Sequence, residues 1–245
     1  MPNHELLEGR HAVTEAIRAG LKPDLIYLQK DLKEEQKNSV LDAAKKAGIR
    51  VRLCEKDKLD ALSATGRHQG VIAETEPLPY AEVSDMLADA RAKDEDPFLV
   101  LLDGIEDPHN LGAIIRSAHQ AGAHGVIIPK NRAAGLNATV ARTSAGAVSF
   151  LPVAQVTNLS RTMEELKKEG LWLACADMDG QVLFRQDLKG PIGLVIGSEG
   201  DGISPNVRKH CDFVVSIPMK GRIDSLNASV AAGILMFEVV RQRSL

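Results

Sequence analysis

Residues 98–129 read FLVLLDGIEDPHNLGAIIRSAHQAGAHGVIIP, and this stretch decides the fold. Two unbroken apolar runs, FLVLLD and GVIIP, enclose a segment whose apolar residues recur with helical spacing. Strands that are apolar throughout, with a helix between them, indicate a parallel sheet covered on both faces. The pattern then continues along the chain, with a helix over 159–170, strands over 171–176, 193–197 and 213–218, and a closing helix over 229–243. We therefore expect an α/β domain built on a parallel sheet.

The first 76 residues predict a separate small α/β unit. Their pattern indicates a helix over 9–20 that stops at Gly20, and a strand over 25–30. An amphipathic helix over 33–48 ends at Gly48, and strands over 49–54 and 70–74 close the unit. Residues 77–97 are bounded by prolines and rich in acidic side chains, which is typical of a connector. The expected division is therefore 1–76, an acidic linker over 77–97, and 98–245.

Composition narrows the class of protein without naming a partner. The formal net charge is −3, and the acidic excess lies in the linker, so charge neither supports nor excludes RNA binding. The longest apolar stretch is too short to cross a bilayer, and Glu5 and Glu8 interrupt any secretion signal. Three widely spaced cysteines and histidines without ligand spacing argue against disulfides and metal sites. We expect a cytoplasmic protein that binds neither a membrane nor a metal.

The loops to inspect follow Leu102, Ile128, Ile196 and Ile217, because ligands of parallel sheets bind beyond the carboxyl ends of the strands. The first of these loops belongs to D-G-I-E-D-P-H-N-L-G-A-I-I-R, residues 103–116. Its Asp-Pro-x-Asn pattern predicts a helix start with Asn110 as N-cap. Arg116 follows on the opening turns. By itself this segment favours a surface arginine, but a cation beside a helix N-terminus also attracts phosphate.

Two further loops carry unusual residues. The loop after the strand over 193–197 reads G-S-E-G-D-G, and a tight turn would explain its glycines but not Glu199. The segment I-P-M-K-G-R-I-D-S-L-N-A-S-V begins at Ile217 and leads into the last helix. Ser225 or Asn227 is a suitable cap for that helix, and both are also suited to orienting a hydroxyl or a carboxylate. Aromatic residues make up 3% of the chain, too few for a base-stacking surface.

Taken in order, D-P-x-N-x-G-x-x-x-R, G-S-E-G-x-G and I-P-M…S-L-N-x-S-V resemble the three signature motifs of the SpoU/TrmH (SPOUT) family of RNA 2′-O-methyltransferases. The resemblance covers about residues 97–243. The segments G-R-H-A-V from Gly9 and R-H-Q-G-V-I-A from Arg67 resemble the family's L30e-like substrate-binding domain. Within the family the likeness is greatest to bacterial enzymes that methylate a guanosine of 23S ribosomal RNA.

The resemblance implies a fold, a cofactor and a site. The fold is a small L30e-like N-terminal α/β domain plus a Rossmann-like catalytic domain with a C-terminal trefoil knot, and the enzyme is a homodimer with its active site at the subunit interface. The knot binds S-adenosyl-L-methionine, with ribosomal RNA as the partner. The cofactor-lining residues are Gly197, Ile217, Met219 and Leu226. The catalytic group comprises Asn110, Arg116, Glu199, Ser225 and Asn227.

Physical chemistry restricts the role of Arg116 within that group. A guanidinium stays protonated near neutral pH, so it is poorly suited to act as a base. Binding the neighbouring phosphate and stabilising the developing alkoxide suit its charge better.

Two other functions of the protein stay open: methylation of transfer RNA ribose, and a catalytically idle RNA-binding factor in ribosome assembly.

Overall fold

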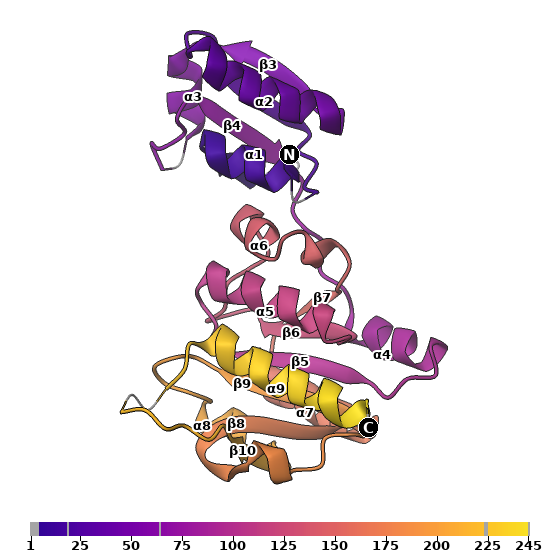
Figure 1. Ribbon diagram of the computed structural model, residues 1–245. Helices are drawn as coiled ribbons and strands as arrows, with labels where there is room; N and C mark the ends of the chain where they lie inside the picture. Colours follow the sequence, from indigo (N-terminus) through magenta and orange to yellow (C-terminus); the bar gives the residue numbers. More distant parts are fainter. Residues whose placement is uncertain (1–4, 19, 64, 223–224, 245) are drawn as a thin grey trace. The chain divides into compact units, whose positions relative to one another are not determined.

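The computed structural model describes residues 5–18, 20–63, 65–222 and 225–244 (Figure 1). Its contacts divide the chain into two compact units. The first unit extends to Pro79 and includes Leu136–Gly146, a segment inserted between two strands of the second unit. The second unit comprises Tyr80–Gly135 and Ala147–Leu245.

The first unit contains a four-stranded sheet with the spatial order β1-β4-β2-β3. Strands β2 and β3 run parallel, and the other two pairs are antiparallel. The strands are β1 (Glu5–Glu8), β2 (Leu25–Gln29), β3 (Arg50–Cys54) and β4 (Val71–Thr75). The helices are α1 (Arg10–Arg18), α2 (Glu34–Ala47), α3 (Lys56–Leu62) and the inserted α6 (Ala138–Thr143).

Strand periodicity divides the core of this unit into two layers. Ile26 and Leu28 belong to a cluster with side chains of α1 and α2, whereas Tyr27 packs with Leu59 of α3. Gly48 ends α2 with a φ of 70°, which confirms the stop expected there. β1 and α3 were not expected from the sequence, because each buries a single side chain and is too short to show a period.

The second unit contains a six-stranded parallel sheet with the order β10-β8-β9-β5-β6-β7. Its strands are β5 (Phe98–Asp103), β6 (Gly125–Pro129), β7 (Val153–Val156), β8 (Trp172–Val182), β9 (Ile192–Gly197) and β10 (Phe213–Ser216). Every pairing is parallel, as the apolar runs predict. β7 lies outside the expected elements.

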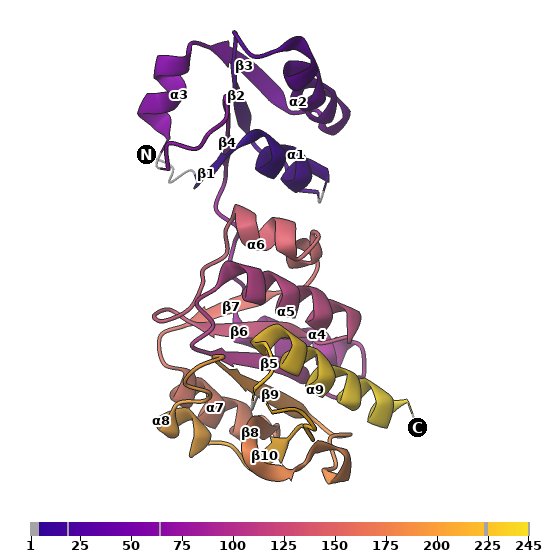
Figure 2. The ribbon, with the colours of Figure 1, turned by 60° about the vertical axis from the view of Figure 1, so that its left-hand side comes forward.

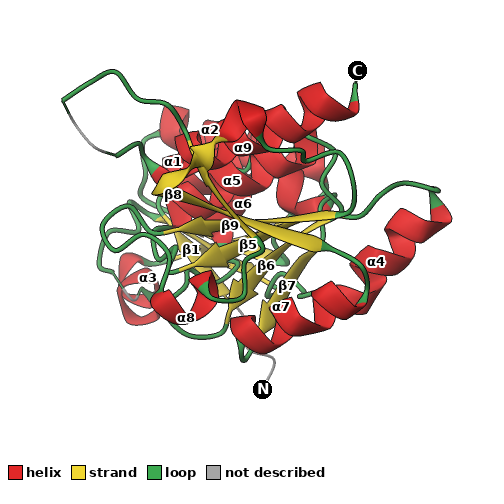
Figure 3. Ribbon diagram, turned by 90° about the horizontal axis from the view of Figure 1, so that it is seen from below, coloured by secondary structure: helices red, strands yellow, loops and turns green. Residues whose placement is uncertain are grey.

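Helices cover both faces of this sheet (Figure 3). Helices α5 (Pro108–Gln120) and α9 (Ala228–Arg243) pack side by side on one face (Figure 2). The other face is covered by α4 (Val83–Ala92), α7 (Leu159–Lys168) and α8 (Pro205–Arg208). The segment 77–97 thus holds a helix, α4, whose Met86 and Ala90 are fully buried while its charged residues face solvent.

The order of strands places a switch point beside β5. From β5 the sheet continues through β6 and β7 in one direction, and through β9, β8 and β10 in the other. Loops that follow β5 and β9 therefore leave the same edge of the sheet as neighbours, which is where ligands of such sheets bind. The trefoil knot implied by the resemblance stays a prediction. Within the described residues, no helix is long and apolar enough to span a membrane.

Candidate active site

The loop after β5 delivers Asn110 to this edge by way of the first turn of α5. Asp107, not Asn110, is the N-cap: its Oδ1 accepts from the His109 N–H at 2.9 Å, and Pro108 occupies the first helical position. The prediction of Asn110 as the N-cap was therefore wrong: the helix begins three residues earlier, at the Asp107–Pro108 pair. Since Asn110 is not needed as a cap, its side chain is available for contacts outside the helix.

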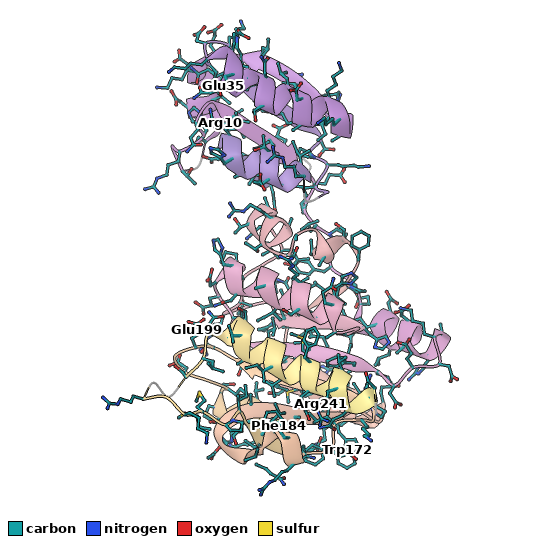
Figure 4. The ribbon with its side chains drawn as sticks, viewed as in Figure 1. Arg10, Glu35, Trp172, Phe184, Glu199 and Arg241 are labelled. Atoms are coloured by element: carbon teal, nitrogen blue, oxygen red, sulfur yellow. The ribbon has the colours of Figure 1, made fainter. Side chains whose placement is uncertain are left out.

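Asn110, Glu199 and Asn227 form one hydrogen-bonded cluster, here called the amide–carboxylate cluster. Glu199 Oε1 accepts from Asn110 Nδ2 at 2.9 Å and from Asn227 Nδ2. Asn227 Nδ2 also donates to Asn110 Oδ1 at 3.0 Å, which closes the triangle. The backbone N–H of Ala228 adds a further donor to Glu199 Oε1 at 3.2 Å. Three segments that are far apart in the chain thus meet at one carboxylate oxygen, beside the first turn of α9 (Figure 4).

Asn227 has a second task, as N-cap of α9. Its Oδ1 accepts from the backbone N–H groups of Ser229 at 3.0 Å and Val230 at 3.3 Å. Of the two cap candidates in the sequence, Asn227 is therefore the one used. Ser225 is exposed and forms no hydrogen bond to the cluster within the described residues, but it lines the neighbouring pocket.

Arg116 stands apart from the amide–carboxylate cluster. It lies six residues beyond Asn110 on α5, which places the two side chains about 120° apart around the helix axis. Its side chain is exposed and has no hydrogen bond or ion pair among the residues that the structure describes. Within one chain, the structure therefore brings together Asn110, Glu199 and Asn227 but leaves Arg116 facing solvent.

A pocket of about 450 Å³ lies beside the cluster, at the carboxyl ends of β9 and β10 and the middle of β8. All four residues expected to line a cofactor, Gly197, Ile217, Met219 and Leu226, contribute to its wall. The glycine loop folds back on itself, with Ser198 N–H donating to the Gly202 carbonyl at 3.0 Å. A Cβ at Gly197 would lie 2.3 Å from the Gly202 backbone, so only glycine permits this close approach.

The middle of β8, where its pairing with β10 is interrupted between Cys175 and Gln181, supplies pocket residues that were not expected from the sequence. Asp177 and Met178 line the pocket, and Arg208 pairs with Asp177 and with Asp179 at 2.7 Å. Hydrogen bonding to Asp179 raises the pKa of Arg208 above its ordinary value. The polar pair Asp177 and Asp179 after an apolar strand was the available signal. It was overlooked because the segment after LWLACA was not among the loops selected for inspection.

The chemistry of the pocket fits a nucleoside with a charged, flexible substituent. Its wall is mostly apolar, which suits a flat ring, and backbone groups of the glycine loop lie within reach of polar atoms. Asp177 and Ser225 add side-chain hydrogen-bonding groups at the rim. Among the described residues, no cluster of histidine, cysteine or acidic side chains is arranged to hold a metal ion.

Comparisons with known proteins agree with this arrangement. The profile of the SpoU rRNA Methylase family matches residues 97–237, and that for RNA 2′-O ribose methyltransferase substrate binding matches residues 6–81. The chain is 46% identical to YacO of Bacillus subtilis, a putative TrmH family tRNA/rRNA methyltransferase, over 98% of this chain and 97% of the relative.

It is also 45% identical to the 23S rRNA (guanosine-2′-O-)-methyltransferase RlmB of Ralstonia nicotianae, over 100% of this chain and 98% of that protein. Among solved structures, the SpoU methyltransferase AviRb from Streptomyces viridochromogenes, in complex with the cofactor AdoMet, is similar with a TM-score of 0.71 and 28% identity. That alignment covers 98% of this chain and 91% of AviRb.

Proposed function

The chain belongs to the SpoU rRNA methylase family of S-adenosylmethionine-dependent RNA 2′-O-methyltransferases, and we propose that its substrate is a guanosine of 23S ribosomal RNA. The 45% identity to a relative named for that reaction, which covers 100% of this chain, supports this substrate. The match of residues 6–81 to a substrate-binding profile supports a role for the first unit in holding the RNA. We place the reaction in the cytoplasm, where ribosomal RNA of bacteria is found.

The observation that carries the proposal is the amide–carboxylate cluster beside the pocket. Glu199 belongs to the cluster and also lines the pocket, so a group in the pocket and a nucleotide at the cluster would be neighbours. Glu199 Oε1 is held by three donors, which fixes the carboxylate before any substrate arrives. Within the described residues, Glu199 Oε2 has no partner. This oxygen is therefore available to accept a hydrogen bond from a ribose hydroxyl.

The pocket residues hold the cofactor. Gly197 and the folded glycine loop bring backbone close to it, while Ile217, Met219 and Leu226 form the apolar wall against which an adenine ring packs. Ser225 and Asp177 face its polar substituents. Bound S-adenosylmethionine supplies a methyl group that its sulfonium already makes electrophilic. The protein's own task is thus to align the hydroxyl and to assist departure of its proton.

We assign Arg116 to the same reaction through a homodimer. Val230, Ile234 and Phe237 share one face of α9, and Val230 and Phe237 are half-exposed despite their apolar side chains. A second copy that covers this face would approach α5, because α5 packs against α9. Arg116 of one subunit then faces the site of the other, where it binds the phosphate next to the target ribose and stabilises the developing alkoxide.

A transfer RNA substrate is the second candidate, because the Bacillus relative carries both RNA classes in its name. A catalytically idle assembly factor is disfavoured, because the amide–carboxylate cluster keeps its amide donors and its carboxylate acceptor, and the cofactor pocket lies beside it. The test maps 2′-O-methyl groups in total RNA from a strain that lacks the protein, and in the same strain complemented with wild type or Glu199→Gln.

We expect one guanosine of 23S RNA to lose its methyl group, and only wild type to restore it. Loss confined to transfer RNA would reject the ribosomal substrate. If the strain that lacks the protein kept all its 2′-O-methyl groups in both RNA classes, the assignment of this protein as a methyltransferase would be rejected.

A further inference from the structure

The first unit contains a hollow of about 730 Å³ that lies outside the active site. The segment G-R-H-A-V, which begins at Gly9, meets the segment R-H-Q-G-V-I-A, which begins at Arg67, beside this hollow. The Gly9 N–H donates to the Val71 carbonyl at 3.0 Å. A Cβ at Gly9 would lie 3.7 Å from the Arg67 carbonyl oxygen and 3.8 Å from Gln69 Oε1. The start of α1 and the loop before β4 therefore form one continuous wall.

A buried histidine holds that loop in shape. His68 is 5% exposed, and its Nδ1 accepts from the Gly70 N–H at 3.0 Å. Since Nδ1 is the acceptor, the ring proton resides on Nε2, which donates to Asp60 Oδ1 at 2.8 Å. With His68 turned inward, its neighbours Arg67 and Gln69 both point outward and line the hollow.

The loop adopts a backbone conformation that its sequence does not favour. Gln69 has a φ of 50°, in the left-handed region that side-chain-bearing residues rarely occupy. Such conformations persist where the surrounding structure holds them, and they concentrate at binding sites. The His68–Asp60 contact supplies this hold, so the outward position of Gln69 is imposed by the fold.

The hollow concentrates positive charge in a part of the chain, residues 1–76, that carries no net charge. Residues 1–76 carry 13 basic and 13 acidic side chains. The hollow nevertheless gathers Arg10, Lys56 and Arg67, and none of the three forms an ion pair within the described residues (Figure 4 labels Arg10). Its one acidic lining residue, Asp60, already accepts from His68. The site is therefore built for an anion.

Three glutamines complete the lining, from β2, α2 and the loop before β4: Gln29, Gln36 and Gln69. Glutamine amides both donate and accept, which suits the edge of a nucleobase. Phenylalanine, tyrosine and tryptophan are absent from the lining, in which His11 supplies the exposed imidazole, so recognition rests mainly on hydrogen bonds and charge. The hollow is open to solvent, and its volume of about 730 Å³ lies in the range of small-molecule binding clefts.

We propose that this hollow binds one unstacked nucleotide of the RNA substrate, with Arg10, Lys56 and Arg67 on its phosphates and the glutamines on its base edge. The inference rests on the proposed function, because it takes RNA as the substrate. It adds a second recognition point on the first unit, at a single-stranded position of the RNA.

The test measures the affinity of the full-length protein for a 23S RNA fragment that wild type methylates, across a series of salt concentrations. Arg67→Ala should raise the Kd on the order of tenfold and lower the salt slope by about 0.7, the value for one lost single-strand phosphate contact. Gln36→Ala should weaken binding about fivefold with an unchanged slope, since it removes no charge. Arg50→Ala is the matched control: an exposed arginine of the same unit outside the hollow, expected to change the Kd less than about twofold.

A fully paired duplex of matched length serves as a second probe. Wild type and Arg67→Ala should bind the duplex equally, because a paired base cannot enter the hollow. Equal losses for Arg67→Ala and Arg50→Ala, or equal losses on loop and duplex RNA, would overturn the nucleotide site and leave only general charge attraction. Binding of S-adenosylmethionine and methyl transfer by wild type are measured separately, so failure of the proposed function is seen independently of failure of this site.

Discussion

Arg116 is the residue at which cooperation between two subunits can be tested directly. Its side chain is exposed and unpaired among the described residues, so Arg116→Ala should change the free energy of unfolding by less than about 0.5 kcal/mol. The same change should lower single-turnover methyl transfer on the order of 10²-fold, the loss typical when one preorganised charge-stabilising group is removed. Glu199→Gln, which alters the amide–carboxylate cluster, should also be nearly inactive as a homodimer.

The heterodimer of these two inactive variants distinguishes the possible arrangements. If Arg116 serves the site of its partner, the subunit with Arg116→Ala keeps an intact Glu199 and receives Arg116 from the other subunit. One of the two sites is then complete, and activity should return to about half of the wild-type value. If Arg116 serves its own subunit, each site contains one defect and activity stays near zero.

The assay uses two affinity tags and co-expression, so that only heterodimers are purified. Transfer of labelled methyl to a ribosomal RNA fragment is measured at saturating cofactor, beside both homodimers and a doubly tagged wild type. A heterodimer as inactive as its parents would refute the shared site. Wild-type rates in the Arg116→Ala homodimer would remove Arg116 from the site altogether.

Three further predictions concern Gly197 in the pocket, Asn227 as the N-cap of α9, and the buried carboxylate of Glu238. Gly197→Ala places a Cβ 2.3 Å from backbone, so it should destabilise the fold by about 1–3 kcal/mol and abolish the thermal shift caused by S-adenosylmethionine. Gly190→Ala, whose Cβ meets no heavy atom within 4 Å, should do neither. Asn227→Ala should cost about 1 kcal/mol through the lost cap, whereas Asn227→Ser keeps a cap but loses the amide donors to Glu199. Full activity in the serine variant would make Asn227 a capping residue only. The hydrogen bonds from Arg241 hold the pKa of buried Glu238 below its ordinary value of 4.5, so the stability it contributes is present above that pH and is lost as the pH falls below it. Urea unfolding should therefore show Glu238→Gln less stable than wild type at pH 7, with the difference shrinking below about pH 4.5. A difference that is constant with pH would contradict the assigned pKa shift.

Much of this fold is readable in the sequence because it depends on local patterns. The runs FLVLL, GVIIP and GLVIG are apolar at every position, and they form most of β5, β6 and β9, buried on both faces of a parallel sheet. Gly48 predicts the end of α2, because a left-handed residue there favours glycine. Short elements such as β1, β7 and α3 could not be predicted, since a segment of a few residues shows no period.

The sequence by itself also determined the cofactor and the family, through three loop motifs whose order along the chain resembles a known set. It could not determine which motif residues meet. Glu199 contacts Asn110 and Asn227 only because β5 and β9 are neighbours in the sheet and α9 begins beside them. Arg116 shares a helix with Asn110, yet the 3.6-residue turn of that helix directs it elsewhere. Contact between distant segments is a property of strand order and helix rotation, and these are decided by packing of the whole chain.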